Sequence, residues 1–222
     1  WRWLVATAFR LLYHELAWSY DLVSWAASRG LWHRWQRVAL GYLPPRGTVL
    51  EVGCGPGHVL VELAERGYQP AGVDASKFMV DLARRRLGQH RPGVALCQAR
   101  AEALPFAPAV CDGVVATFPT AYIYDPAWIR HAMRVLKPGA SLAIIDMTTF
   151  GSTDPVSRSL EWLYQVTGQR GPSPDLVALL QRAGFDAQRY SVEMQGSTVS
   201  AVVATKGQVP RYPRVHPTCV GN

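Results

Sequence analysis

Three glycines lie at alternate positions in a segment that reads VLEVGCGPG over residues 49–57. Gly53, Gly55 and Gly57 follow an apolar run with strand character and precede a pattern with helical periodicity. Backbone without side chains lets a ligand come within contact distance of such a turn. The free N–H groups and the dipole of the following helix attract polar ligand groups. The spacing differs from the G-x-G-x-x-G of dinucleotide sites, so the segment predicts a ligand-binding turn of another kind.

Two acidic residues give this turn its predicted chemistry. Glu51 comes just before the turn, where it would repel a pyrophosphate but attract an ammonium group. Asp74 ends the next apolar run, 17 residues after Gly57, and a carboxylate there can accept hydrogen bonds from both ribose hydroxyls. A glycine turn alone is a weak signal, and an ordinary tight turn with a surface aspartate is the alternative. The combination favours a ligand-binding site.

Strand and helix patterns alternate around this turn. Strict alternation predicts an α/β fold, with a mostly parallel sheet and helices on both faces. Pro138-Gly139 predicts a turn before the fifth strand, and Gly196-Ser197 predicts that the last two strands form an antiparallel hairpin at the sheet edge. Strands are expected at 48–53, 69–74, 94–98, 110–117, 141–146, about 187–194 and 199–204, and helices at 57–66, 76–87, from 126 onward and at 175–183.

Length and composition fit one globular domain. A chain of 222 residues, of which 49% are hydrophobic, can bury one sizeable core. We expect an α/β ligand-binding domain over 47–206, an N-terminal helical lid or cap over 1–46 and a C-terminal tail over 207–222. Residues 151–174 are the least regular stretch and are candidates for lining a substrate pocket. Disordered, collagen-like and disulfide-scaffold classes are excluded, because only 18% of residues are charged and the four Cys show no paired spacing.

The first 50 residues are rich in Arg and Trp. They hold six Arg, two acidic residues and six of the eight Trp, and residues 1–16 place apolar side chains at helical spacing. This pattern is typical of contact with a membrane interface, but a helix that caps the protein's own core also produces it. The net charge of +7 is not gathered into a stripe, so no specific nucleic-acid binding is expected. The cysteines and the lack of a signal or spanning pattern predict a cytoplasmic protein, membrane-peripheral under the first interpretation.

Several segments resemble the class I S-adenosylmethionine-dependent methyltransferases. Within the small methyltransferase-domain group, the similarity is greatest to the ubiquinone/menaquinone biosynthesis C-methyltransferases. The resemblance covers roughly residues 18–147, and 175–205 in pattern only. It implies a Rossmann-like seven-stranded sheet with an antiparallel last strand, S-adenosylmethionine as cofactor and S-adenosylhomocysteine as product. The similar segments are LEVGCGPG (50–57), GVDAS (72–76), QARAEALPF (98–106), CDGVVATF (111–118) with RVLKPGASLAIID (134–146), and, less specifically, YDLVSWAASRGLWHRW (20–35).

The resemblance also implies roles for individual residues at the cofactor site. The glycine turn would surround the methionine part through its backbone, and Glu51 would orient the turn or the amino group. Met79 is explained equally well as helix core. The implied cofactor contacts are Gly53, Cys54, Gly55, Pro56, Gly57 and Glu51 around the methionine part, Asp74 at the ribose, Ala75, Met79, Arg100 and Ala101 at the adenine, Thr117 and Phe118 beside the sulfonium, and Tyr20 closing the site from the N-terminal segment.

Two positions depart from the family pattern. Position 100 is usually Asp or Asn, which can accept a hydrogen bond from the adenine amino group, whereas Arg100 has no acceptor. The missing hydrogen bond would cost about 1 kcal/mol, or near tenfold in affinity. Position 56 is often Thr in the quinone group and is Pro here, which weakens the quinone assignment more than the cofactor assignment.

Methyl transfer from a sulfonium is an in-line displacement with a neutral leaving group. Alignment and exclusion of water are therefore the main tasks of the protein. A phenol or aromatic carbon acceptor must be deprotonated, and the candidates for the base are Tyr122, Tyr124 and His33, each of which a structural role also explains. His58 and His131 lack partners at metal-ligand spacing, so no metal is expected.

Three functions fit the sequence. The first is methylation of a small apolar, lipid-like acceptor of the quinone or phenol type. The second is methylation of a lipid head-group amine or a soluble metabolite. The third is a catalytically silent binding domain, which only Arg100 supports. Nucleobase methylation is disfavoured because ATFPTAY, after the fourth strand, lacks the Asn/Asp-Pro-Pro-aromatic motif, and a nicotinamide oxidoreductase is disfavoured by the glycine spacing and Glu51. The sequence makes no prediction of the oligomeric state.

Overall fold

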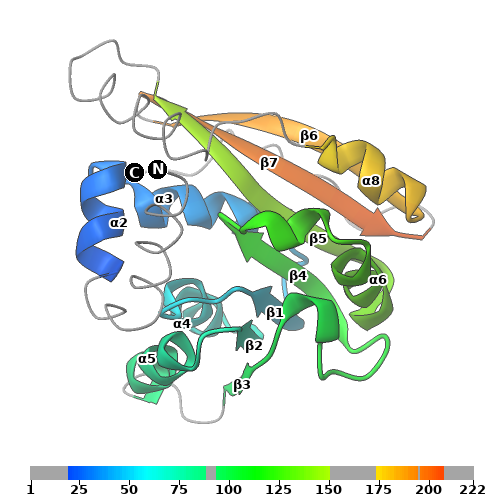
Figure 1. Ribbon diagram of the computed structural model, residues 1–222, viewed down its shortest axis with the longest axis horizontal. Coiled ribbons are helices and arrows are strands. Elements are labelled where there is room, and N and C mark those ends of the chain that lie inside the picture. The colour runs from blue at the N-terminus through cyan, green and yellow to red at the C-terminus, as the bar shows by residue number, and fades with distance from the viewer. Residues whose placement is uncertain (1–19, 89–93, 151–173, 195, 208–222) are drawn as a thin grey trace, which may run out of the picture.

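The computed structural model describes residues 20–88, 94–150, 174–194 and 196–207, which contain a single seven-stranded sheet. The strand order is β3-β2-β1-β4-β5-β7-β6 (Figure 1). β7 is antiparallel to both of its neighbours, and the other strand pairs are parallel. The expected α/β fold with an antiparallel last strand is therefore confirmed. The strands are β1 (Thr48–Val52), β2 (Gln69–Asp74), β3 (Ala95–Gln98), β4 (Cys111–Thr117), β5 (Leu136–Phe150), β6 (Phe185–Met194) and β7 (Ser197–Lys206).

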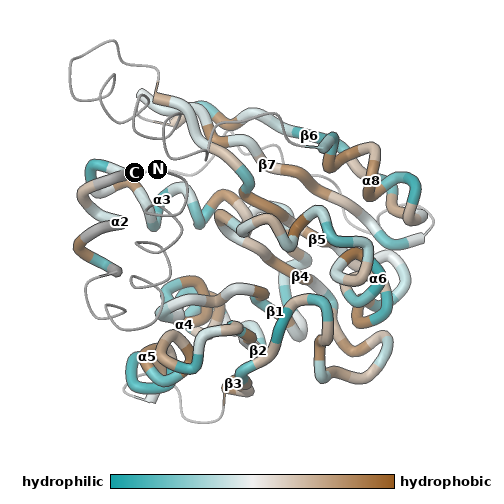
Figure 2. Tube along the Cα trace, in the orientation of Figure 1, coloured by the Kyte–Doolittle hydropathy of each residue, from teal (hydrophilic) through white to brown (hydrophobic). Residues whose placement is uncertain are grey.

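Helices cover both faces of the sheet, as the alternating pattern predicts. One face packs against α6 and α8, with Trp128 and Leu180 fully buried, and the other packs against α3, η2 and α4, with Trp35 and Leu63 fully buried. Figure 2 shows hydrophobic residues along the central strands β4 and β5. The helices are α2 (Tyr20–Ser28), α3 (Trp32–Arg37), η2 (Val38–Tyr42), α4 (His58–Glu65), α5 (Lys77–Gly88), η3 (Ala101–Ala103), η4 (Ala121–Tyr124), α6 (Pro126–Val135) and α8 (Leu176–Arg182).

Between β1 and β4, the chain stops adding strands to one side of the sheet and begins adding them to the other. The chain adds β2 and β3 on one side of β1, then crosses to add β4 and β5 on the other side. In open α/β sheets, the crevice outside the carboxyl ends of the strands at such a reversal is where ligands bind. The glycine turn follows β1 and Phe118 follows β4, so both border this crevice.

The fifth strand is longer than the sequence predicts. β5 extends from Leu136 to Phe150, whereas the apolar pattern suggested only 141–146, and Pro138-Gly139 lies within it rather than in a turn before it. The prediction of a separate turn was therefore wrong. The physical reason is a bulge. Cys111 pairs with Leu136 and Gly113 with Ser141, so residues 137–140 lie opposite the single residue Asp112, and pairing continues on both sides of them.

Two helix starts follow the expected capping chemistry. The Asp125 carboxylate accepts from the N–H of Ala127, with Pro126 at the first helical position of α6. The Asp175 carboxylate accepts from the N–H groups of Val177 and Ala178 at the start of α8. The helical pattern at 1–16, the pocket-lining candidates at 151–173 and the tail at 208–222 lie outside the described residues.

Candidate active site

The glycine turn folds back over the end of β2. The N–H groups of Gly53 and Cys54 donate to the carbonyl of Val73, over 2.8 and 3.0 Å. All three glycines have positive φ, at +71° for Gly53, +50° for Gly55 and +83° for Gly57, a region that other residues rarely adopt. The sequence therefore needs glycine at these positions for the conformation of the backbone itself.

The glycines differ in what surrounds them. A Cβ on Gly57 would lie 2.9 Å from the Cβ of Ala83 on α5, so this glycine is needed for helix packing. A Cβ on Gly55 would meet nothing within 4 Å, so its Cα faces open space where a ligand can approach the backbone. Cys54 is buried, and burial raises the pKa of its thiol well above the usual range, so it is a packing residue rather than a nucleophile.

Asp74 organises the loop that follows the turn. One carboxylate oxygen accepts from the N–H of Gly55 over 2.9 Å, and the other accepts from the N–H of Ser76 over 2.8 Å. The same carboxylate thus joins the glycine turn to the start of α5. Ala75 beside it is exposed, and its carbonyl accepts from the side chain of Gln98.

Glu51 is a buried acid with an unsatisfied oxygen. Its side chain is 1% exposed, and Oε2 has no hydrogen-bond partner among the described residues. Burial, and then the nearby charge of Asp74, raise the pKa of Glu51 well above its usual value. An orphaned acidic oxygen two residues before Gly53 suits a ligand that brings an ammonium group to the turn.

The predicted adenine-side residues lie in different environments. Ala101 is buried at the start of η3, whereas the Arg100 side chain is 77% exposed and pairs with Glu102 at 3.3 Å. Met79 is fully buried in α5, a position that favours its interpretation as helix core.

At the end of β4, two aromatic side chains stack. Phe118 has φ +49°, an uncommon conformation for a bulky residue, and its N–H donates to the carbonyl of Ile145. Trp32 on α3 stacks on Phe118, with 4.2 Å between ring centroids and 30° between planes. Gln36, one turn further along α3, donates to the hydroxyl of Thr117 over 3.0 Å. These contacts fix α3 across the carboxyl end of β4.

The tyrosines proposed as bases have structural contacts. The Tyr122 hydroxyl donates to the carbonyl of Val52 over 3.1 Å, and its ring meets Trp128 edge to face. Tyr122 therefore braces the end of β1 against η4. Tyr124 is partly buried against the core. Tyr20 begins α2, but its side chain lies outside the described part of the chain.

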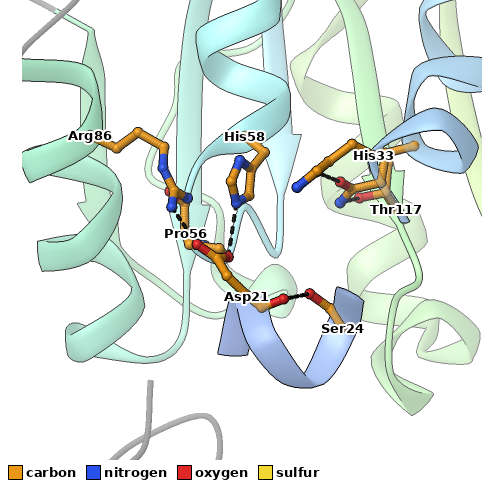
Figure 3. Close-up of polar contacts among 8 residues, drawn as sticks. Asp21, Ser24, His33, Pro56, His58, Arg86 and Thr117 are labelled. Atoms are coloured by element: carbon orange, nitrogen blue, oxygen red, sulfur yellow. Dashed lines mark hydrogen bonds and ion pairs between the residues drawn. The ribbon is translucent and has the colours of Figure 1, made fainter. Parts of the chain in front are cut away.

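A polar cluster that no sequence motif predicts joins α2 to the glycine turn (Figure 3). Asp21 bonds to Nε2 of His58 over 2.8 Å and accepts from Arg86 over 2.6 Å. Arg86 also donates to the carbonyl of Pro56 within the turn, over 2.7 Å. The ring of His33 lies against that of His58, with 3.9 Å between centroids. These residues come from α2, α3, α4 and α5, so no local spacing could reveal the cluster.

Electrostatics in the cluster favour an ionised Asp21. The hydrogen bond with His58, together with the charges of His58 and Arg86, lowers the pKa of Asp21 to about 2 despite partial burial. Partial burial and the neighbouring His58 lower the pKa of His33. Within the described segments, no group of three or more His, Cys, Asp or Glu side chains is arranged to hold a metal ion.

Several known proteins are similar to this chain. Residues 49–139 match the family model of a methyltransferase domain. The 2-phytyl-1,4-naphtoquinone methyltransferase of Thermosynechococcus vestitus is 29% identical over 90% of this chain and 100% of its own length. The demethylmenaquinone methyltransferase of Renibacterium salmoninarum is 30% identical over 63% of this chain and 60% of its own.

Solved structures show the same fold. Phosphoethanolamine N-methyltransferase 2 of Haemonchus contortus, in complex with S-adenosylmethionine, has a TM-score of 0.61 at 18% identity, covering 81% of this chain and 53% of its own. A putative S-adenosylmethionine-dependent methyltransferase of Methanococcus maripaludis has a TM-score of 0.63 at 16% identity, and the similarity covers 88% of this chain and 94% of that protein's chain. The fold is thus the Rossmann-like fold of these methyltransferases. Together the comparisons support an S-adenosylmethionine-dependent methyltransferase, with S-adenosylmethionine as its cofactor.

Proposed function

We propose that this enzyme methylates a flat, prenylated hydroquinone or phenol. The observation that carries the proposal is the aromatic wall formed by Trp32 and Phe118 at the end of β4, close to the predicted position of the sulfonium. Trp35, which is fully buried, meets Phe118 and Phe150 edge to face, with 6.2 and 5.6 Å between ring centroids, and so supports this wall from the core. Stacked aromatic side chains favour a flat, apolar ring over a small polar amine. The names of the quinone methyltransferases among the relatives give further support.

We assign the cofactor to the glycine turn and Asp74. S-adenosylmethionine supplies an electrophilic methyl group on a positively charged sulfur. The backbone of Gly53, Gly55 and Gly57 would surround the methionine part, and the orphaned oxygen of Glu51 fits its ammonium group. Asp74 would keep its loop contacts and accept from the ribose hydroxyls. The other predicted contacts, Cys54, Pro56, Ala75, Met79, Arg100, Ala101, Thr117, Phe118 and Tyr20, are part of the same proposal.

Alignment of the acceptor falls to the N-terminal helices. α3 is anchored to the sheet by Gln36 on Thr117 and by the indole N–H of Trp35, which donates to the hydroxyl of Ser197 over 2.9 Å. We propose that α2 and α3 cover the crevice and exclude water from the reacting atoms. The buried ring of Trp35 would keep this cover in register with β7.

We also propose that α2 touches a lipid surface when the acceptor is membrane-held. Leu22 and Trp25 are 66% and 62% exposed, and they lie three residues apart on one face of α2. Exposed apolar and Trp side chains on a segment that also carries Arg29 and Arg34 are suited to an anionic bilayer interface. No helix in the described part of the chain is long and apolar enough to cross a membrane.

Acceptor assays test the proposal. Purified enzyme is incubated with labelled S-adenosylmethionine and, in parallel, dithionite-reduced 2-prenyl-1,4-naphthoquinone, a prenylated phenol and phosphoethanolamine, with products identified by mass spectrometry. We expect methylated quinol or phenol and no methylated phosphoethanolamine. Methylation of phosphoethanolamine alone would contradict the proposal. Co-sedimentation with phosphatidylglycerol vesicles tests the lipid contact. The Leu22→Ser/Trp25→Ser double variant should pellet less than wild type, and equal pelleting of the two proteins would contradict the contact.

A further inference from the structure

The methylation of a hydroquinone ring carbon needs a base, and no residue with an assigned contact supplies one. Deprotonation of the ring hydroxyl raises the electron density of the neighbouring carbon, which then attacks the methyl group. The Tyr122 hydroxyl is committed to the carbonyl of Val52, and Tyr124 packs against the core. The carboxylates of Asp74 and Asp21 are held by other partners. The imidazoles of His33 and His58 are further proton acceptors at this edge of the sheet.

His58 has the position and the partner that a base requires. It is the first residue of α4, directly after Gly57, and its side chain is 26% exposed. Its Nε2 lies 2.8 Å from the Asp21 carboxylate. An ionised carboxylate accepts a proton from the ring, so Asp21 fixes the tautomer in which Nε2 carries hydrogen and Nδ1 carries the lone pair. Within the described segments, Nδ1 of His58 makes no hydrogen bond.

The surroundings keep Asp21 charged and in place. Arg86 of α5 holds its second oxygen and is itself anchored on the Pro56 carbonyl. The hydrogen bond with His58 and the charge of Arg86 lower the pKa of Asp21 to about 2, which favours the ionised carboxylate. Its negative charge stabilises the imidazolium that forms when His58 accepts a proton. The charged or titratable groups facing His58 are Asp21 on α2, His33 on α3 and Arg86 on α5.

His33 lacks such a partner. Its Nδ1 lies 3.3 Å from the amide oxygen of Gln36, whose amide nitrogen donates to Thr117. No ion pair with a carboxylate is described for it, and the pKa of His33 is lowered by burial and by His58. Its ring, 3.9 Å from His58, forms a side wall of the cluster. The two histidines can therefore be distinguished by experiment.

We infer that His58, oriented by Asp21, is the base that removes the hydroxyl proton of the acceptor. The inference rests on the proposed function. The proton passes from the hydroxyl oxygen to Nδ1 of His58, and the ring carbon forms a bond to the methyl carbon. The bond from methyl carbon to sulfur breaks, and its electron pair leaves with a neutral thioether. The hydrogen on the alkylated ring carbon is then lost as a proton to water, which restores the aromatic ring, and the ring oxygen takes its proton back from Nδ1 of His58, so that the hydroquinone and the neutral imidazole are both regenerated.

Steady-state kinetics with acceptors of graded acidity test this role. The acceptors are reduced 2-prenyl-1,4-naphthoquinone and the same compound chlorinated on its second ring, whose hydroxyls are more acidic. His58→Gln should lower kcat for the first acceptor by about 10²–10⁴-fold. The loss should shrink at least about tenfold with the chlorinated acceptor, because less help is needed to ionise it. The decline of wild-type kcat at acid pH should be absent from the variant.

Matched variants separate a base from a structural contact. His33→Gln removes the neighbouring imidazole and should cost less than about tenfold, whereas Asp21→Asn should cost more than His33→Gln. The Kd for S-adenosylmethionine, measured by calorimetry, should stay within about threefold in all three variants, which also shows that they fold. An equal kcat loss for both acceptors, or a parallel loss of cofactor affinity, would overturn the inference. The His58–Asp21 pair would then only stabilise the glycine turn.

The outcomes for the two proposals are distinct. A wild-type enzyme that methylates neither quinol contradicts the proposed function, and this inference with it. A wild-type enzyme that methylates both, with His58→Gln at full kcat, contradicts the inference alone.

Discussion

The glycine-turn region and the region beneath α2 and α3 are built in different ways. In the first, residues 53–57 and 74–76 are joined by backbone N–H groups that donate to the Val73 carbonyl and the Asp74 carboxylate. In the second, side chains from distant elements meet, as Trp32 does with Phe118 and Asp21 with His58 and Arg86. Under the proposed function, cofactor binding would therefore depend on backbone conformation, and acceptor selection on side-chain identity. Substitutions in the two regions should therefore fail in different ways.

The largest expected effect is a difference in folding stability between substitutions at two glycines of the turn, Gly57 and Gly55. Gly57→Ala places a Cβ 2.9 Å from Ala83 at φ +83°, so strain and overpacking should lower the free energy of unfolding by about 2–5 kcal/mol. Gly55→Ala meets no protein atom within 4 Å and should cost only about 1–2 kcal/mol, while its Cβ obstructs the ligand. Urea unfolding and cofactor titration measure the two effects. Equal stability of the two variants would contradict this division of roles.

Glu51 should make the stability of the cofactor-free protein depend on pH. Its pKa is raised above the ordinary 4.5 in the folded state, so its contribution is fully present below that value. The contribution is lost as pH rises towards the folded-state pKa, by about 1.4 kcal/mol for each pH unit in that interval. Glu51→Gln removes the effect and should therefore gain stability over wild type as pH rises from 5 to 8. Thermal unfolding curves that stay parallel across this range would refute it.

Substitutions in the aromatic wall should lower kcat/KM for the acceptor without changing the affinity for the cofactor. Trp32→Ala removes the stacking on Phe118 and should lower kcat/KM for a prenylated naphthoquinol by about tenfold, since such ring pairs are worth about 0.5–1.5 kcal/mol. Trp32→Phe, which keeps a flat ring, should retain most of the activity. If both variants lose activity equally, the indole rather than the stacking surface is what matters.

The smallest expected change is in cofactor affinity on substitution of Arg100, and the affinity should rise. Its guanidinium is exposed and pairs with Glu102, so Arg100→Asn removes little from the fold. Asn can accept from the adenine amino group, and one added hydrogen bond is worth about 1 kcal/mol. Cofactor affinity should rise by up to about tenfold in a calorimetric titration, with Arg100→Ala as control. Weaker binding in the Asn variant would show that Arg100 itself contacts the cofactor.

The two regions also differ in how far the sequence predicts them. The glycine turn and Asp74 could be recognised because short strands end at glycines and an acid, and each signal lies within a few residues. The bulge that extends β5 could not, since it depends on how Asp112 fits against 137–140 of the neighbouring strand. The Asp21 cluster joins residues 37 and 65 positions apart, which only the folded chain brings together. Side-chain networks of this kind leave no periodic signal.

Calorimetric titration with S-adenosylmethionine of wild type, Asp74→Ala and Trp32→Ala tests the division between the two regions most directly. Asp74 accepts two backbone hydrogen bonds as a charged group, each worth about 1.5–3 kcal/mol, so its loss should weaken cofactor binding at least about a hundredfold. Trp32→Ala should bind within about threefold of wild type. Equal losses of affinity in the two variants, or full affinity in Asp74→Ala, would contradict the assignment of the cofactor to the glycine turn and Asp74.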